Sequence, residues 1–413
     1  MTYGKFNVDW QQRVDFDRLR QDRIDKANAQ LHKFGVGAAI VYSWDTSRYL
    51  GSPWCHPYGR HLPRRFALLI RDAGFPYVTV GDNDGWWPRH EAPWLEGRIC
   101  TDDTLYQPTT INIIDEVAGL EDCKKTVQQI QGLMKKHGVE GLPVSIDWSG
   151  VFLPQALREA GITVVNGNTW ALEASMVKTE DEVELMKMAA TCNEAGYGAL
   201  VKEFRVGMRE NEVQSIMGKA IYNAGAEYIE GWVVDSGPRA APRAYNWSDR
   251  TVRPGEFMSV EACHVTYCGY KVCYDRTFFV GDKPNETQKE IYACTADLHH
   301  KIKNTLKPGL TNREIINLRP FLSGPLKSLK EVKEYRTKFN NHLGGMGIRW
   351  NDSPHPRLDD PDRTLEKNMI LAYHSVYLLE GVAGVAIENT YRITDDGCEC
   401  LNLWPWEELM VLG

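Results

Sequence analysis

The residues best suited to chemistry lie in one short stretch, VEACHVTYCGYKVCYDRTFFVG (260–281). It holds two carboxylates and three thiols, and the four groups that concern us are Glu261, Cys263, Cys273 and Asp275. The alternation of this stretch about Cys268-Gly269 is typical of a β-hairpin, which would place the four side chains on one face of paired strands. Such a patch can bind a metal ion, do covalent or acid–base chemistry, or, for the thiols alone, fill a core. Two facing carboxylates favour a functional site, because burying them without partners is costly.

Three later motifs add further reactive groups: NNHLGGMGIRW (340–350), ILAYHSVY (370–377) and GVAIENTYRIT (384–394). They contain His342, Arg349, His374 and Glu388. Imidazole titrates near neutral pH, so we expect His342 and His374 to form a proton-transfer pair. Asp275 and Glu388 would orient them or hold a positive or hydrogen-bonding group of the substrate. The alternative for each histidine is a core residue with satisfied hydrogen bonds.

These motifs, with DRTFFVG and MVKTEDEVELM, occur in the order seen in the creatinase/prolidase family, and the whole chain resembles this M24-like "pita-bread" group. The resemblance implies an α/β N-terminal domain and an α+β pita-bread C-terminal catalytic domain. In the metal-dependent members, two Asp, one His and two Glu hold two divalent ions. The last four of these ligands fall at Cys273, His342, His374 and Glu388. The first Asp has no clean counterpart, because Glu261, Ala262 or Cys263 occupies its region.

The resemblance therefore implies that the dinuclear metal site is not retained, as in creatinase, and no cofactor is expected. The alternative is a single zinc or iron ion, since thiolate and imidazole ligands favour softer ions. Its ligands would come from Cys263, Cys273, His342, His374 and Glu388, with Glu261 as a substitute. Four protein ligands would close a tetrahedral zinc shell and make that ion structural.

Likeness to creatinase also indicates how a substrate would bind. Tyr58-Gly59-Arg60 resembles the segment that a partner subunit's N-terminal domain supplies to bind the substrate carboxylate. This implies a homodimer in which each N-terminal domain completes the other subunit's site. The expected substrate-binding set is Tyr58, Arg60, Tyr245, Arg349 and Glu261. Arg239, Arg243 and Arg349 add positive charge, which points to a small anionic substrate.

Three classes of function are compatible with these residues. The leading hypothesis is a small-molecule hydrolase that cleaves an amide- or amidine-like C–N bond in a carboxylate-bearing substrate by His-centred acid–base catalysis. The second is a lyase or decarboxylase, similar to the dimethylsulfoniopropionate lyase of the same family. The third is a non-catalytic binding protein on the same scaffold.

Composition excludes several other classes. The net charge of −7 gives no electrostatic footprint for nucleic acid. No apolar run approaches the roughly 18–20 residues of a membrane span, and the polar, partly acidic N-terminus does not look like a presequence. Ten unevenly spaced cysteines do not form a disulfide framework, so we expect a cytoplasmic protein with reduced thiols.

The elements that must position these residues divide the chain at residue 170. In 1–170, helices and strands alternate, which is typical of an α/β domain: helices near 14–34, 121–138 and 151–161, strands near 36–44, 65–72, 76–82, 141–148 and 162–167. In 171–413, capping boxes at Thr179 and Thr311 open helices. The strands expected there are 228–236, 257–267, 270–280, 369–377 and 383–394. Helices with antiparallel hairpins predict an α+β domain.

Overall fold

The computed structural model describes residues 13–413 except 52–64, 80–89, 91, 109–114, 148, 242, 318–336, 346–362 and 380–382, and gives the backbone alone over 337–345. The chain forms two compact units, and Ser175 ends the first. The boundary expected at residue 170 lies inside a helix, α7 (Asn168–Met176), so the structure divides the chain slightly later.

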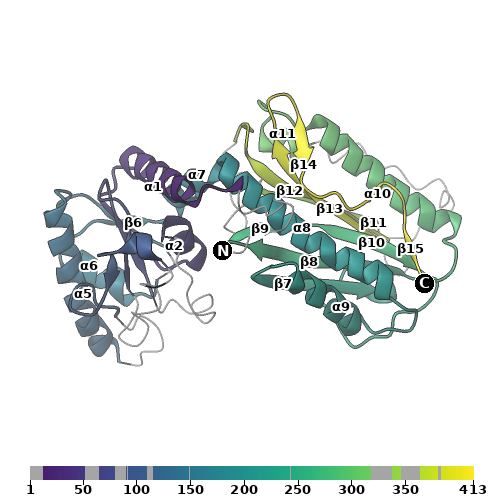
Figure 1. The fold of residues 1–413 in the computed structure, drawn as a ribbon, viewed down its shortest axis with the longest axis horizontal. Coiled ribbons are helices and arrows are strands. Elements are labelled where there is room, and N and C mark those ends of the chain that lie inside the picture. Colours follow the sequence, from purple (N-terminus) through teal and green to yellow (C-terminus); the bar gives the residue numbers. More distant parts are fainter. Residues whose placement is uncertain are drawn as a thin grey trace. The chain divides into compact units, whose positions relative to one another are not determined.

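The first unit is a mixed sheet with helices (Figure 1). Its elements are α1 (Phe16–Lys33), β1 (Ala38–Val41), α2 (Trp44–Gly51), β2 (Ala67–Ile70), β3 (Tyr77–Thr79), β4 (Ile99–Cys100), α5 (Glu116–Lys136), β5 (Val144–Ile146), α6 (Phe152–Glu159), β6 (Val164–Asn166) and α7. The sheet order is β4-β3-β2-β1-β5-β6, with β1, β5 and β6 parallel to one another. The buried strand residues Ile40 and Leu68 share one core with Ile130 of α5 and Leu157 of α6.

The second unit contains two mainly antiparallel sheets, each preceded by a pair of helices. The first set is α8 (Glu180–Glu203), α9 (Glu210–Asn223), β7 (Tyr228–Ser236), β8 (Phe257–Tyr267), β9 (Tyr270–Val272) and β10 (Asp275–Val280). The second set is α10 (Glu286–Thr305), α11 (Asn312–Asn317), β11 (Thr337–Gly345), β12 (Ile370–Leu379), β13 (Ala383–Ile393) and β14 (Cys398–Cys400), and β15 (Val411–Leu412) returns to β10. In Figure 1, α8 and α9 lie along the first sheet and α10 along the second. Strands β8 and β10 contact β13, so the two sheets meet there.

Helix α8 begins where the sequence predicts. The backbone N–H of Thr179 donates to Glu182 and that of Glu182 donates to the Thr179 hydroxyl, which completes the predicted capping box. The other oxygen of Glu182 accepts a 2.7 Å hydrogen bond from the Tyr270 hydroxyl on β9. One side chain thus fixes both the start of α8 and its place on the sheet.

The predicted hairpin forms, but it contains a β-bulge. At its tip Tyr267 pairs with Tyr270, whereas further along Glu261 pairs with Asp275, so one extra residue lies in β8 between these pairs. His264 takes up the extra length with a φ of +53°, a left-handed conformation that non-glycine residues rarely adopt. The bulge separates β9 from β10 and sets Glu261 opposite Asp275.

Side chains of β10 join the two sheets next to this bulge. The buried guanidinium of Arg276 donates to the backbone carbonyl of Glu388 and to the side chain of Asn389, both on β13. The Thr390 hydroxyl donates to the carbonyl of Cys273, and Thr277 exchanges hydrogen bonds with the backbone of Ala386. Strands from opposite ends of the domain are therefore held in fixed register.

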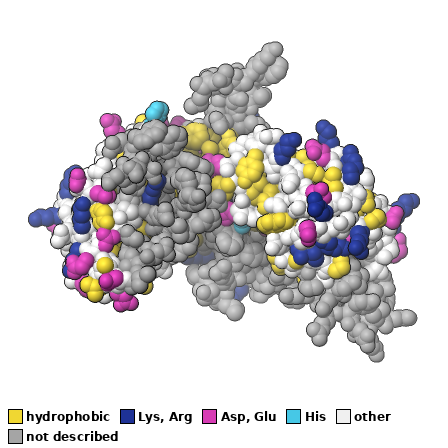
Figure 2. All heavy atoms as spheres, turned by 90° about the horizontal axis from the view of Figure 1, so that it is seen from below, with side chains coloured by type: hydrophobic (Ala, Val, Ile, Leu, Met, Phe, Trp, Pro, Cys, Tyr) yellow, Lys and Arg dark blue, Asp and Glu magenta, His cyan; other side chains and the backbone are white. Residues whose placement is uncertain are grey.

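An α/β domain followed by an α+β domain agrees with the expected fold class. Within the described residues, the cysteines are free thiols, and no helix is both long and apolar enough to cross a membrane. On the face drawn in Figure 2, acidic and basic side chains occur over each unit.

Tyr197 provides a test of how α8 docks. Its buried hydroxyl lies 2.7 Å from the carbonyl of Val260 and 3.0 Å from that of Tyr274. Tyr197→Phe leaves these acceptors without this donor, so we expect a loss of about 1–2 kcal/mol in the free energy of unfolding, measured with urea. The same change at Tyr222, which is 51% exposed on α9, should have little effect. Equal losses in both variants would contradict this role.

Candidate active site

Four ionisable side chains from four strands meet where the two sheets join. Glu261 on β8 pairs with Asp275 on β10, and His374 on β12 pairs with Glu388 on β13. All four are buried. Because directly opposite residues of antiparallel strands project from the same face, each sheet contributes one pair to the site.

A buried arginine connects the two pairs. Nη2 of Arg243 donates 2.8 Å to Oε2 of Glu261 and also donates to Oδ2 of Asp275. Its Nη1 lies 3.3 Å from Nε2 of His374. Arg243 is only 7% exposed, and its Nε has no partner among the described residues. A guanidinium remains charged even here, so it supplies a fixed positive charge next to both carboxylates.

The loop after β7 holds Arg243 in place. Oδ2 of Asp235 accepts the backbone N–H groups of Ala244 and Tyr245, at 3.1 and 3.2 Å. Tyr245 has a φ of +54°, and its ring centre lies 4.9 Å from the guanidinium carbon of Arg243. This cation–π contact and the anchored turn fix the arginine from its own segment.

Asp275 is the anion of the site. Burial by itself would raise its pKa, but Arg243 and the hydrogen bond with His374 lower the pKa to about 2. Its other oxygen, Oδ1, accepts a 2.9 Å hydrogen bond from the Ser259 hydroxyl. Asp275 therefore carries a negative charge throughout the neutral range.

His374 has a separate neighbour for each of its protonation states. Arg243 can only donate hydrogen bonds, so when the imidazole of His374 is neutral, Arg243 donates to the lone pair on Nε2. When Nε2 is protonated, Oδ2 of Asp275 accepts at 3.5 Å. Burial lowers the pKa of His374, but Glu388 and Asp275 outweigh that effect and raise it. This arrangement suits a group that takes up and releases a proton.

Glu388 is the carboxyl group of the site that can accept a further hydrogen bond. Burial, opposed by His374, raises its pKa to about 7. Its Oε2 is buried with no hydrogen-bond partner among the described residues, while the side chain is 4% exposed. An unpaired buried acceptor is costly, so this oxygen is available to a ligand.

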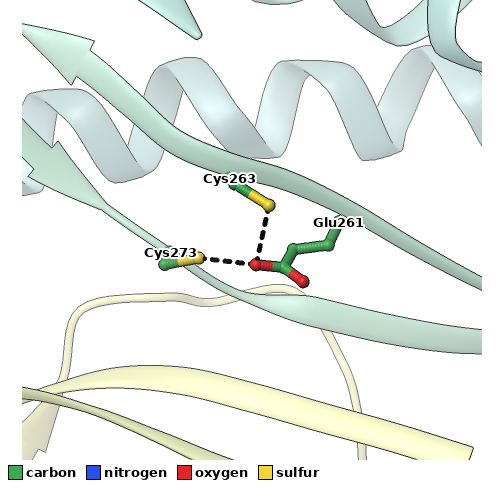
Figure 3. A group of neighbouring side chains, drawn as sticks. All are labelled: Glu261, Cys263 and Cys273. Atoms are coloured by element: carbon green, nitrogen blue, oxygen red, sulfur yellow. Dashed lines mark hydrogen bonds between the residues drawn. The ribbon is translucent and has the colours of Figure 1, made fainter. Parts of the chain in front are cut away.

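Two thiols complete the patch on the other side of Glu261 (Figure 3). Cys263 and Cys273 donate to the same oxygen, Oε1 of Glu261, at 3.0 and 2.9 Å. The three ligand atoms lie within 4.8 Å of one another. Hydrogen bonding with Cys273 lowers the pKa of Cys263, but burial and Glu261 raise it to about 12. Hydrogen bonding with Cys263 and burial raise the pKa of Cys273, so neither thiol is activated as a nucleophile.

A polar layer behind the sheet supports His374 and Glu388. Their chain neighbours Ser375 and Asn389 face the opposite side of the sheet, where each hydrogen-bonds to the buried imidazole of His299, at 3.1 and 2.8 Å. Burial and Arg276 lower the pKa of His299, which is therefore neutral. The imidazole joins β12 to β13 directly behind the reactive groups.

The structure brings together much of the predicted site. Asp275, His374 and Glu388 of the catalytic set lie together with Glu261 and the two cysteines. Tyr58, Arg60 and Arg349 lie outside the described residues, and of His342 only the backbone is described, paired in register with His374. Arg243 was noted in the sequence only for its charge, and no local pattern marks it as the centre of the cluster. The sequence feature that could have indicated its role is its position two residues before Tyr245, which belongs to the expected substrate-binding set.

Comparisons with known proteins agree with this fold. The sequence profile of metallopeptidase family M24 matches residues 184–395. The Xaa-Pro dipeptidase of Pyrococcus furiosus is 27% identical over 229 residues, which cover 55% of this chain and 63% of that protein. The chain thus spans just under two thirds of that relative, and a similar 62% of its Pyrococcus horikoshii counterpart. Dimethylsulfoniopropionate lyase DddP of Roseovarius nubinhibens is 24% identical over 419 residues, 96% of this chain and 88% of the lyase.

Solved structures match over nearly the whole chain. A Xaa-Pro dipeptidase from Bacillus anthracis superposes with a TM-score of 0.74 at 20% identity, covering 95% of this chain and 99% of that one. The prolidase from Pyrococcus horikoshii OT3 gives 0.71 at 18% identity, covering 94% and 100%. At these identities the likeness establishes the fold.

Asp235 gives a pH-dependent test of the loop that carries Arg243. Burial, opposed by Arg243, raises its pKa from 3.8 to about 6. The folded state then keeps a proton that the unfolded chain releases, so stability falls as pH rises from about 4 to above 6. Asp235→Asn does not titrate, so its unfolding free energy relative to the natural chain should rise by about 2–3 kcal/mol across this window. Asp249→Asn, at an exposed position of the same loop, should show no such trend in urea unfolding.

Proposed function

The chain belongs to metallopeptidase family M24, and on this premise we propose that it is a hydrolase of small molecules. It would cleave an amide- or amidine-like C–N bond in a carboxylate-bearing substrate, with His374 transferring the proton and Glu388 aligning the substrate. The observation that carries this proposal is the position of Nε2 of His374 between a fixed donor, Arg243, and a fixed acceptor, Asp275.

The residues present do not fit the two hard divalent ions that the family implies. Such ions favour carboxylate, carbonyl and water oxygen ligands. Here a thiol stands at Cys273 and an imidazole at His374, while the guanidinium of Arg243 already contacts Glu261 and Asp275. The mechanism proposed below therefore has no step through a metal ion.

In this mechanism neutral His374 takes a proton from water as the water oxygen bonds to the carbon of the scissile C–N bond. The protonated imidazole is then stabilised by Asp275, and it returns the proton to the leaving nitrogen as that bond breaks. The unpartnered oxygen of Glu388 would accept an N–H of the amide or amidine group, which aligns the substrate.

The rest of the substrate site remains part of the proposal. Tyr58, Arg60 and Arg349 would bind the substrate carboxylate, with Tyr245 at the entrance, where its side chain is 55% exposed. Tyr58 and Arg60 would come from the partner subunit of a cytoplasmic homodimer. His342, paired in register with His374, would assist in proton transfer.

A second candidate is a lyase. The DddP relative supports it, because the match to that protein covers nearly the whole chain. In this alternative Glu388 or His374 would remove a proton from carbon and the leaving group would depart without water. Only hydrolysis places solvent oxygen in the product.

We expect His374→Gln to lower turnover by about 10²–10⁴-fold, because it removes the group that transfers the proton. Purified protein treated with a chelator would be screened against amidino and acylamino carboxylates, Xaa-Pro dipeptides and dimethylsulfoniopropionate. The reaction would be run in ¹⁸O-labelled water and the products analysed by mass spectrometry. Turnover that survives chelation, with one labelled oxygen in the product that keeps the scissile carbon and none in the amine, supports the proposal.

His32→Gln serves as the matched control. His32 is a half-exposed residue of the first unit that pairs with Asp72, and neither residue belongs to the site. It should leave turnover unchanged, and urea unfolding should show that His374→Gln remains folded. Products without solvent oxygen would favour the lyase. Turnover of Xaa-Pro dipeptides that chelation abolishes would overturn the proposal in favour of metal-dependent peptidase activity.

A further inference from the structure

The position of Arg243 within the acidic cluster has a consequence beyond proton transfer. We propose that its guanidinium is the resident cation of the site, in the place where a metallopeptidase holds a divalent ion. Its removal would open a soft-metal site formed by Glu261, Cys263 and Cys273. This inference concerns which cation balances the site, so it stands or falls separately from the reaction proposed above.

The contacts of Glu261 carry the first step. One carboxylate oxygen accepts from Arg243 at 2.8 Å, and the other accepts from both thiols, at 2.9 and 3.0 Å. The carboxylate therefore bridges two positions, one occupied by a guanidinium and one surrounded by sulfur (Figure 3). Bridging carboxylates are a device for holding two cations close together, and here one of the two is built into the chain.

Burial carries the second step. Glu261 and Asp275 are 7% and 0% exposed, and a buried carboxylate pair is tolerated only when a cation compensates it. Arg243 supplies that compensation through the same nitrogen, Nη2, which donates to both carboxylates. A divalent ion bound at Glu261 would lie close to this fixed positive charge, so the guanidinium opposes metal binding.

The donor set carries the third step. Without Arg243 the carboxylates would lack a counter-charge, and a divalent ion that displaces the protons of the two thiols would restore it. Two thiolates and a carboxylate select zinc or cobalt over magnesium or manganese. Glu388 is the candidate for a fourth ligand, because its buried Oε2 is unpartnered among the described residues and its charge contributes to the raised pKa of both thiols.

The test is a cobalt titration of the full-length chain, purified without a tag and stripped of metal. Sulfur-to-cobalt charge transfer gives an intense near-ultraviolet band only when thiolates bind the ion. The natural chain should show no such band and no bound cobalt after dialysis. Arg243→Met should bind about one equivalent, show the band, and have its urea midpoint raised by cobalt.

Matched variants separate the possible causes. Arg243→Met/Cys273→Ser should lose the band, and Arg243→Lys, which keeps a positive charge, should bind no cobalt. Arg239→Met is the control, because Arg239 instead pairs with Glu210 at 3.0 Å; it should behave as the natural chain does. A second opening variant, Arg243→Gln, guards against misfolding of the Met variant.

Two outcomes would overturn the inference. One is stoichiometric cobalt with a thiolate band in the natural chain, since the guanidinium would then not exclude the ion. The other is folded Arg243→Met or Arg243→Gln protein that binds no cobalt. Neither outcome depends on a substrate, so failure here leaves the proposed hydrolase intact, and absence of turnover leaves this inference intact.

Discussion

The contact between one buried guanidinium and two buried carboxylates determines the character of this protein's site. Arg243 lies between Glu261 and Asp275 and reaches His374 on the neighbouring sheet. Removing one partner of a buried ion pair leaves an uncompensated charge, at a cost of about 3–5 kcal/mol. The arginine therefore supplies a fixed positive charge beside both carboxylates and places a hydrogen-bond donor next to the histidine.

That contact depends on two sheets being held in register. Arg276 and Thr390 connect the first sheet to β13, and His299 joins β12 to β13 from behind. These hydrogen bonds are buried, so water cannot replace a partner that is lost, and breaking any of them is costly. The reactive groups consequently lie on rigid strands, which suits a site whose proton donor and acceptor must stay within hydrogen-bond distance.

The comparison with relatives separates scaffold from chemistry. The fold is shared with a solved dipeptidase, and the sequence is similar to a lyase, over most of the chain, yet fold alone does not determine reaction type. Thiols at Cys263 and Cys273 beside Glu261 form a donor set that favours softer ions than an all-oxygen site does. The guanidinium of Arg243 lies against the same carboxylate.

The sequence by itself determined the two-domain fold class and the motifs that contribute to the site. Period-two alternation predicted β8 and the returning strand, and capping residues predicted the start of α8, because these signals are local. The alternation indicated a hairpin that carries Glu261 and Asp275, and motif order singled out His374 and Glu388. Which residues of the two hairpin strands pair depends on the bulge.

Only the tertiary structure decided how these residues work together. Arg243 lies in a loop, where no periodicity specifies the direction of a side chain, and its partners come from strands that are distant in sequence. The sequence also does not indicate the one-residue bulge at His264, since an insertion of one residue leaves no mark on composition. Long-range packing determines which charges share a buried volume, and burial is what makes their pairing obligatory.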